Sequence, residues 1–213
     1  MEDYAKLSID DFLNRVADRT PTPGGGGVTG LAGALSCAMA RMVAAYSKRK
    51  DATSEDQAAI ESVLTKLRRA DEILRSLISQ DAAVYEKMTS ARKASEANDR
   101  KDSDLEACYQ RTVLEAVAVP MEMAAAASMA ITEMDKFKDL ASRYLLSDLA
   151  IAAVLARATA RAARCTLWVN VAEITDGDQR AKLMTNIDRL ILHCASHLTA
   201  IEAFVHRSLE EHG

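Results

Sequence analysis

Helix-breaking residues are concentrated in one place in this chain of 213 residues, and that distribution constrains its fold more than any other feature. Only 3 prolines and 8 glycines occur, and most of the glycines fall between Gly24 and Gly30. The rest of the chain is therefore free to form long helices. Hydrophobic residues make up 49% of the sequence but aromatic residues only 4%, a mixture that favours close-packed helices over sheets. We predict an all-α fold, an up-and-down bundle of long helices, in a single domain covering residues 1–213.

Hydrophobic spacing predicts where the helices lie. Ser8 followed by Asp11 resembles a capping box and predicts a short helix over residues 8–18. A helix rich in small residues follows the glycines and is expected to be central, because its small faces let other backbones approach closely. Ser54 with Gln57 is expected to open a long helix to about residue 93. A loop is predicted over residues 94–104 and a helix over 104–118. The next helix is expected to start or kink at Pro120. The last two helices are predicted over 148–174 and after a turn at 176–178.

Charge and composition exclude several classes of function. The net charge of −4 and the pI of about 5.6 give no reason to expect nucleic acid, whose binding needs a basic face. We find no apolar run of the roughly 20 residues that span a bilayer, and the opening MEDYAKLSIDDF lacks the features of a signal peptide. A cytoplasmic protein with a small ligand or a protein partner, and no membrane partner, is expected.

Cysteine and histidine spacing gives no metal motif. Cys37, Cys108, Cys165 and Cys194 are far apart, and we expect reduced, mostly buried thiols. Two histidines in the last helix are spaced i, i+4 and share a face, but no carboxylate or cysteine motif is near them in the sequence. No metal site is predicted.

The segment PTPGGGG, residues 21–27, is the first candidate binding element. Its composition predicts irregular structure directly before a helix, where unobstructed N–H groups can bind an anion or a planar ring. It is neither a P-loop nor a dinucleotide fingerprint, because no Gly-Lys-Ser/Thr follows and no strand precedes. A flexible linker is the alternative, but two rigid prolines favour a binding role. The candidate contacts are Pro23, Gly24, Gly25, Gly26 and Gly27.

The whole stretch PTPGGGGVTGLAGALSCAMARMVAAYSKRK resembles the opening of the cyclodeaminase/cyclohydrolase family. Members of that family begin with a Pro-x-Pro-Gly-Gly-Gly turn, an Ala/Gly-rich helix and a Tyr-x-Lys/Arg-Arg/Lys segment. The likeness continues, in the family's order, through LISQDAAVYEKM, AVAVPMEMA, SDLAIAAVLA and the Asn of WVNVAEITD. The resemblance implies an all-helical homodimer that acts on a folate in one-carbon metabolism.

Two departures from the family pattern leave the substrate open. Related enzymes often carry Leu-Pro-Lys where this chain has Lys93-Ala94-Ser95, and Gly-Asn-x-Asn where it has Ala141-Ser142-Arg143-Tyr144. A diverged member with another ligand is therefore an alternative.

Hydrolysis of a methenyl bridge needs an activated water, stabilisation of the tetrahedral adduct and a proton for the departing nitrogen. Asp81 lies four residues before Tyr85 and thus on the same helix face, in an otherwise apolar stretch. We predict that Asp81 is a general base or stabilises the cation, and that Tyr85 contacts the substrate. A solvated helix aspartate is the alternative.

The resemblance points to further site residues. Lys48 matches a basic position of the family's Tyr-x-Lys/Arg segment. With Arg49 and Lys50, it could bind the glutamate tail of a folate. The alternative is that these basic residues only complement the helix dipole at the last turn. Asp148 follows Ser147 before a very apolar helix, where both could be ordinary capping residues or ligand contacts.

Tyr46 and Asn170 are further candidates, as pterin contacts through ring packing and a hydrogen-bonding amide. Either could equally be a satisfied core residue.

The leading hypothesis is a homodimeric 5,10-methenyltetrahydrofolate cyclohydrolase that needs no metal or organic cofactor. The glycine turn would seat the folate, Asp81 and Lys48 would do the proton and charge work, and Asp148 would assist. The nearest alternative is a cyclodeaminase that releases ammonia from 5-formiminotetrahydrofolate. That activity usually occurs fused to a transferase domain, which these 213 residues do not contain. A non-catalytic helical module that binds folate or a protein is the third hypothesis.

Overall fold

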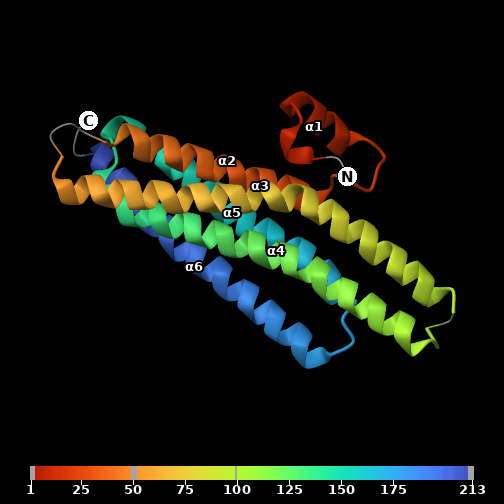
Figure 1. Ribbon diagram of the computed structural model, residues 1–213. Helices are drawn as coiled ribbons and strands as arrows, with labels where there is room; N and C mark the ends of the chain where they lie inside the picture. Colours follow the sequence, from red (N-terminus) through yellow and green to blue (C-terminus); the bar gives the residue numbers. More distant parts are fainter. Residues whose placement is uncertain (1–2, 49–51, 99, 211–213) are drawn as a thin grey trace.

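The computed structural model describes residues 3–48, 52–98 and 100–210, and every regular element within them is helical. Five long helices run up and down beside one another, and a short helix lies against one side of the bundle (Figure 1). The all-α up-and-down prediction is therefore confirmed. The α-helices are α1 (Ile9–Ala17), α2 (Gly25–Tyr46), α3 (Ser54–Glu96), α4 (Ser103–Phe137), α5 (Leu146–Val171) and α6 (Gly177–Glu210), with 3-10 turns η1 (Tyr4–Lys6), η2 (Lys138–Leu140) and η3 (Arg143–Leu145).

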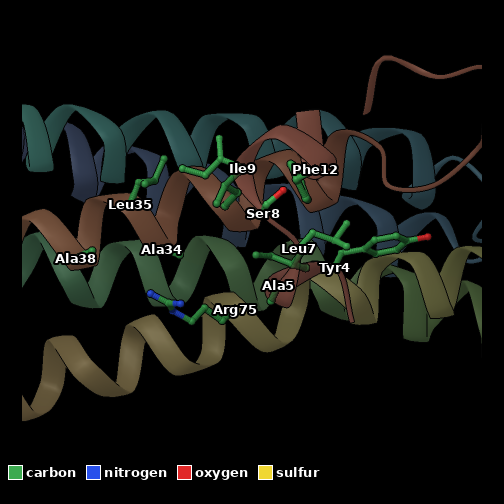
Figure 2. Close-up of a pocket in the computed structure, with 12 residues that line it drawn as sticks. Tyr4, Ala5, Leu7, Ser8, Ile9, Phe12, Ala34, Leu35, Ala38 and Arg75 are labelled. Carbon is green, nitrogen blue, oxygen red and sulfur yellow. The ribbon is translucent and has the colours of Figure 1, made fainter. Parts of the chain in front are cut away.

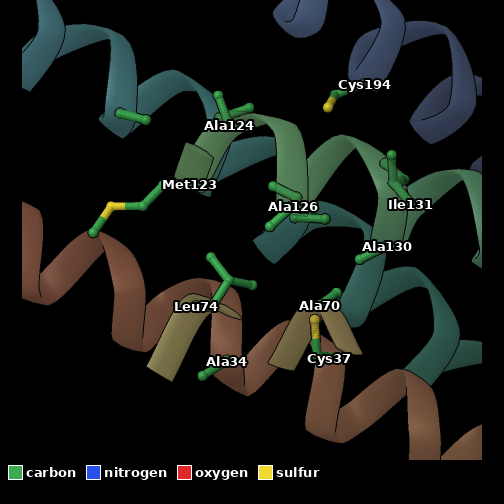
Figure 3. Close-up of a cluster of buried hydrophobic side chains, with 14 of the residues drawn as sticks. Ala34, Cys37, Ala70, Leu74, Met123, Ala124, Ala126, Ala130, Ile131 and Cys194 are labelled. Atoms are coloured by element: carbon green, nitrogen blue, oxygen red, sulfur yellow. The ribbon is translucent and has the colours of Figure 1, made fainter. Parts of the chain in front are cut away.

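Small side chains let α2 pack closely between α3 and α5. A Cβ added to Gly30 would lie 2.8 Å from Ile78 Cγ1 and 3.1 Å from the Leu74 carbonyl oxygen of α3. A Cβ added to Gly33 would lie 2.7 Å from Leu74 Cδ2 and 3.0 Å from Thr159 Cγ2 of α5. Figure 3 shows Leu74 among the small buried side chains of the core. The glycines thus leave no room for larger residues where α2 meets α3 and α5. The expectation that this helix is central was wrong, because α4 is the one that packs against all the other long helices.

Several helix starts agree with the sequence. The Ser8 hydroxyl accepts the Asp11 N–H at 3.1 Å, as the capping box predicts. The turn at Asp176 is also confirmed, because its carboxylate accepts the N–H groups of Asp178 and Gln179 at the start of α6.

Other boundaries differ from the prediction. Gly24 is the N-cap of α2, so Gly25, Gly26 and Gly27 form its first helical turn rather than irregular structure. Thr53, one residue before the predicted cap, accepts the Asp56 N–H at 3.1 Å. Ser147 lies inside α5, which starts at Leu146, so it does not cap that helix. The predicted loop 94–104 shrinks because α3 continues to Glu96 and α4 begins at Ser103.

Pro120 neither starts nor ends a helix, because α4 runs through it without interruption. A proline has no N–H, so the carbonyl of Ala116, four residues earlier, loses its helical partner. Asn170 of α5 replaces that partner, since its Nδ2 donates to the Ala116 oxygen at 2.8 Å. The prediction of a break was wrong because the donor comes from another helix.

Two helices, α2 and the run Ser103–Leu140 that contains α4, are long and apolar enough to cross a membrane by length and composition alone. The expectation that no segment reaches this size was therefore wrong. In the second of these helices, 61% of the most apolar 18-residue stretch is buried, as in the core helix of a bundle. In α2 the buried share of the corresponding stretch is only 50%.

The four cysteines are free, but only two are buried. Burial raises the pKa of the Cys37 thiol to about 12 and that of Cys194 to about 11, so both stay protonated at neutral pH. Cys108 and Cys165 are exposed, so the expectation of mostly buried thiols holds for half of them.

Candidate functional site

A cavity of about 390 Å³ lies where the first turn of α2 meets the middle of α3 and the C-terminal half of α5. This size suits a small-molecule ligand. The cavity joins six of the predicted site residues with a set of mostly apolar side chains. Its lining residues are Pro21, Thr22, Gly24, Gly25, Gly26, Asp81, Val84, Tyr85, Met88, Ala116, Cys165, Thr166, Val169 and Asn170.

Gly26 and Asp81 lie in close contact in the lining of this cavity. A Cβ added to Gly26 would lie 1.9 Å from Asp81 Oδ1 and 2.4 Å from Oδ2, so only glycine leaves room for the carboxylate. The backbone N–H of Gly27 donates a hydrogen bond to the same carboxylate. None of the described glycines has a positive φ. Gly26 is therefore needed for space rather than for an unusual backbone conformation, whereas a Cβ added to Gly24 or Gly25 would make ordinary contacts at 3.4 and 4.0 Å.

Burial raises the pKa of Asp81 above its usual range, and the hydrogen bond from Gly27 opposes this shift. A carboxylate in this state is a better proton acceptor than a solvated one. The N-terminus of α2 also favours a negative charge at this point. The structure thus gives the predicted acid–base residue a suitable environment.

Tyr85 and Asn170 line the cavity, as the sequence analysis expected. Tyr85 lies one turn after Asp81, and its side chain is 39% exposed. The Asn170 amide is held by its donation to the Ala116 carbonyl. Within the described part of the chain its Oδ1 has no hydrogen-bond donor, so it is available to accept one from a ligand.

The segment before α2 is tied to the bundle by the N-terminal residues. The Tyr4 backbone N–H donates to Ser79 Oγ of α3 at 2.9 Å, and the Tyr4 hydroxyl lies 3.2 Å from Thr22 Oγ1. These contacts hold Thr22 at the rim of the cavity. Pro23 and Gly27 lie beside the cavity but do not line it, and a Cβ added to Gly27 would lie 3.3 Å from Pro23 Cβ.

Four predicted site residues lie elsewhere. Tyr46 and Lys48 are at the C-terminal end of α2, and Ser147 and Asp148 are at the start of the antiparallel α5. The length of α2 separates them from the cavity by about 30 Å. Lys48 is paired with Glu61 of α3. A site within one chain therefore cannot combine Lys48 or Asp148 with Asp81. The hypothesis that these three residues act together is thus wrong for a site built from a single chain. Arg49 and Lys50 lie outside the described residues.

The sequence analysis did not single out Thr166, Cys165, Val169 or Met88 as lining residues. One signal was available, because Thr166 precedes Asn170 by four residues and so shares its helix face. The others are ordinary apolar or small residues whose role depends on how the helices pack.

A second, smaller cavity of about 100 Å³ lies between α1, α2 and α3 (Figure 2). Its walls are mainly apolar, including Leu7, Phe12 and Leu31. Its cationic side chain, Arg75, donates from Nε to the buried Asp71 at 2.7 Å. Because that charge is already paired, this cavity offers less chemistry than the one at Asp81.

Comparison with protein families matches residues 8–189 of this chain to formiminotransferase-cyclodeaminase. A methenyltetrahydrofolate cyclohydrolase of Methylorubrum extorquens is 25% identical over 169 residues, which are 79% of this chain and 81% of that protein. The formimidoyltransferase-cyclodeaminase of Mus musculus is 26% identical over 185 residues. That alignment covers 86% of this chain but only 34% of the mouse protein.

Among solved structures, the fold is similar to a formiminotetrahydrofolate cyclodeaminase from Thermotoga maritima. The TM-score is 0.85 at 25% identity, and the superposition covers 96% of this chain and 98% of that one. The likeness therefore extends over the whole bundle rather than over a shared pair of helices.

Proposed function

The chain belongs to the formiminotransferase-cyclodeaminase family, and we propose that it is an enzyme that hydrolyses 5,10-methenyltetrahydrofolate to 10-formyltetrahydrofolate. The observation that carries this proposal is the partly buried Asp81 carboxylate, with its raised pKa, in a ligand-sized and mostly apolar cavity. The similarity to a named cyclohydrolase over most of both chains supports it.

The chemistry requires little more than such a carboxylate. The methenyl bridge is a cationic carbon between two nitrogens, which a neighbouring carboxylate attracts. Asp81 accepts a proton from a water molecule as the water oxygen bonds to the bridging carbon. The bond from that carbon to N5 then breaks, and Asp81 returns the proton to N5. Loss of the adduct's hydroxyl proton to solvent leaves the formyl group on N10, with one proton released overall.

The other lining residues fit a pterin. Val84, Met88 and Val169 provide apolar contact for the ring system, and Tyr85 an aromatic face. Asn170 Oδ1 can accept a hydrogen bond from a ring nitrogen or amino group. In this scheme no metal or organic cofactor takes part.

We also propose that the protein is a homodimer whose subunits meet at the exposed face of α2 and α5. This face is named the α2/α5 face here. None of the exposed residues of α2 is charged, and Arg161 is the exposed charged residue of α5, although 27% of the chain is charged. Its larger members are at least two-fifths exposed, which is unusual for a face that stays in water. They are Val28, Leu35 and Tyr46 of α2, Ile151, Val154 and Val169 of α5, and Tyr144 beside the start of α5.

A dimer through this face would bring the predicted site residues that are far apart in one chain close together across the interface. The cavity lies at one end of the face and Tyr46, Ser147 and Asp148 at the other. A two-fold axis perpendicular to the helices makes each α2 antiparallel to its partner's α2. The Asp148 end of one subunit would then approach the Asp81 end of the other, and Lys48 would supply charge across the interface.

A second candidate is the cyclodeaminase reaction, which the names of the mouse and Thermotoga relatives favour. There N10 of 5-formiminotetrahydrofolate attacks the formimino carbon, and Asp81 would give a proton to the departing ammonia. The same cavity serves both reactions, so substrate choice decides between them.

The test follows the near-ultraviolet absorbance of 5,10-methenyltetrahydrofolate in a buffer where spontaneous hydrolysis is slow. The protein should remove the chromophore, and Asp81→Asn should lose at least about 100-fold in rate. Glu86→Gln changes an exposed carboxyl on the same helix, outside the cavity, and should leave the rate unchanged. If the protein leaves the chromophore intact but releases ammonia from 5-formiminotetrahydrofolate, the second candidate replaces the first. Activity with neither substrate rules out both.

Whether the site crosses the interface is tested by coexpressing Asp81→Asn with Lys48→Ala. In a shared site, each hybrid dimer has one intact site, and random pairing would give about a quarter of wild-type activity. If the site is confined to one chain, Lys48 lies about 30 Å from it, so Lys48→Ala alone should be fully active and the mixture should keep about half of the wild-type activity.

A further inference from the structure

A hydrogen-bonded chain of side chains joins α4 and α6 away from the Asp81 cavity. Ser128 Oγ lies 2.9 Å from His193 Nδ1, His193 Nε2 lies 3.1 Å from His197 Nε2, and His197 Nδ1 lies 2.8 Å from Asp135 Oδ2. The two imidazole rings are edge-on, with centroids 4.4 Å apart. The sequence showed the two histidines on one face but not their partners, which come from a helix more than fifty residues earlier.

The positions of the protons in this hydrogen-bonded series of side chains follow from the chemistry of its groups. Asp135 also forms an ion pair with Lys138, whose Nζ lies 3.0 Å from its Oδ1. An ionised carboxylate only accepts, and His197 Nδ1 therefore carries a proton. The other ring nitrogen of His197, Nε2, lies 3.1 Å from Nε2 of its neighbour His193.

The close approach of the two Nε2 atoms needs a positive charge or a proton between them. Two lone pairs 3.1 Å apart repel each other, so in the free protein one Nε2 must be protonated. A metal ion could take that place if the His193 proton moved to Nδ1 and the Ser128 hydroxyl turned from donor to acceptor.

We propose that His193 and His197 form a binding site for a divalent transition-metal ion, with Asp135 and Ser128 orienting the two rings. Two imidazole nitrogens bound to one tetrahedral ion at the usual bond lengths are about 3.3 Å apart, close to the observed spacing. Each ring already has its other nitrogen held by a hydrogen bond, and a carboxylate behind a ligating histidine is the common second-sphere arrangement. Such contacts fix ring orientation before an ion binds.

The surroundings define what kind of site this is. His193 is exposed and borders an open surface depression shared with Asn186, Arg189 and Ser128, so water molecules can complete the coordination. With only two protein ligands and the cationic Arg189 nearby, the site should bind more weakly than a four-ligand structural zinc site. Imidazole ligands and the usual order of stability predict that Cu²⁺ binds more tightly than Ni²⁺ or Zn²⁺.

The test uses the full chain without a histidine tag, titrated separately with Cu²⁺, Ni²⁺ and Zn²⁺ by calorimetry. One ion per chain is expected, and the electron paramagnetic resonance spectrum of bound Cu²⁺ should show two nitrogen ligands. His193→Gln or His197→Gln should weaken Cu²⁺ binding by at least about tenfold, and Asp135→Asn by about tenfold through its effect on His197. His206→Gln, an exposed histidine on the same helix outside this cluster, is the matched control and should bind like wild type.

Circular dichroism of each variant shows whether it folds, and the nitrogen count in wild type tests the site without any substitution. The proposal is overturned if wild type shows fewer than two nitrogen ligands, if the double variant His193→Gln, His197→Gln binds as tightly as wild type, or if His206→Gln removes the binding. Because the Asp81 cavity shares no residue with this site, Asp81→Asn should bind the ion like wild type whether or not the proposed enzyme activity holds.

Discussion

The carboxylate of Asp81 occupies the space that a side chain on Gly26 would fill, since a Cβ there would lie 1.9 Å from Asp81 Oδ1. The glycine run and the aspartate, which are far apart in the sequence, are thus two halves of one steric arrangement. The backbone of α2 approaches Asp81 closely enough for Gly27 to donate its N–H to the carboxylate.

Gly26→Ala should therefore separate activity from stability. The added methyl group displaces the flexible end of the Asp81 side chain, which can rotate away, so the fold should persist while the hydrolysis rate falls by about 100-fold. Gly30→Ala is the contrasting variant, because its methyl group would meet the Leu74 backbone, which cannot rotate away. It should lower the free energy of unfolding by about 1–3 kcal/mol and leave the rate per folded molecule unchanged. Urea denaturation and the absorbance assay together check both variants, and a fully active Gly26→Ala would contradict the role given to Asp81.

Asp81→Asn should make the protein more stable at neutral pH. Because the folded-state pKa of Asp81 lies above the ordinary value of 3.8, the ionised carboxylate destabilises the fold. At a pH below the ordinary pKa, Asp81 is protonated in both the folded and the unfolded state, and the wild-type fold is not destabilised. Once the pH has risen above the raised pKa, Asp81 is ionised in both states, and the destabilisation is complete. The asparagine does not titrate, and its carbonyl oxygen can still accept from Gly27.

The melting temperatures of wild type and Asp81→Asn, measured from neutral to acidic pH, test this sign. The variant should melt higher at pH 7, and the difference should shrink as the pH falls. A variant less stable than wild type at pH 7 would mean that the Gly27 hydrogen bond outweighs burial.

Local signals in the sequence predicted local structure correctly. The caps at Ser8 and Asp176 were visible because donor and acceptor lie within three residues of each other. Hydrophobic spacing likewise located the long helices, since each buries one face. Asp81 and Tyr85 could be placed on one face for the same reason, and both line the cavity.

What the sequence did not predict depends on contacts between helices. The helical state of Gly25–Gly27 and the passage of α4 through Pro120 both depend on partners in other helices. The distance of Lys48 from the cavity is different, because it follows from the unbroken length of α2 and not from contacts between helices. A carboxylate beside His197 was also invisible, because Asp135 belongs to α4.

Asn170 and Pro120 should be energetically coupled. In the wild-type background Asn170→Ala leaves the buried Ala116 carbonyl without a donor and should cost about 1–3 kcal/mol. In a Pro120→Ala background the restored backbone N–H can bond to that carbonyl, and the same substitution should cost clearly less. Urea denaturation of the four proteins gives the coupling free energy. Equal costs in the two backgrounds would show that Asn170 does not act as the replacement donor.

Ile151→Glu should dissociate the proposed dimer. Ile151 is 48% exposed in the single chain and lies in the α5 part of the α2/α5 face, so a carboxylate there would be buried without a partner when two subunits meet. Sedimentation should show a dimer for wild type and a folded monomer for the variant. If the site is shared between subunits, the monomer should also lose the cyclohydrolase activity.

Leu192→Glu is the matched control, because Leu192 is 70% exposed on α6 and is not part of that face. It should remain dimeric and active. A wild-type protein that sediments as a monomer would remove the interface from the proposal and, with it, any role for Lys48 and Asp148 in the chemistry at Asp81. An active monomeric Ile151→Glu would instead confine catalysis to the residues that line the cavity of a single chain.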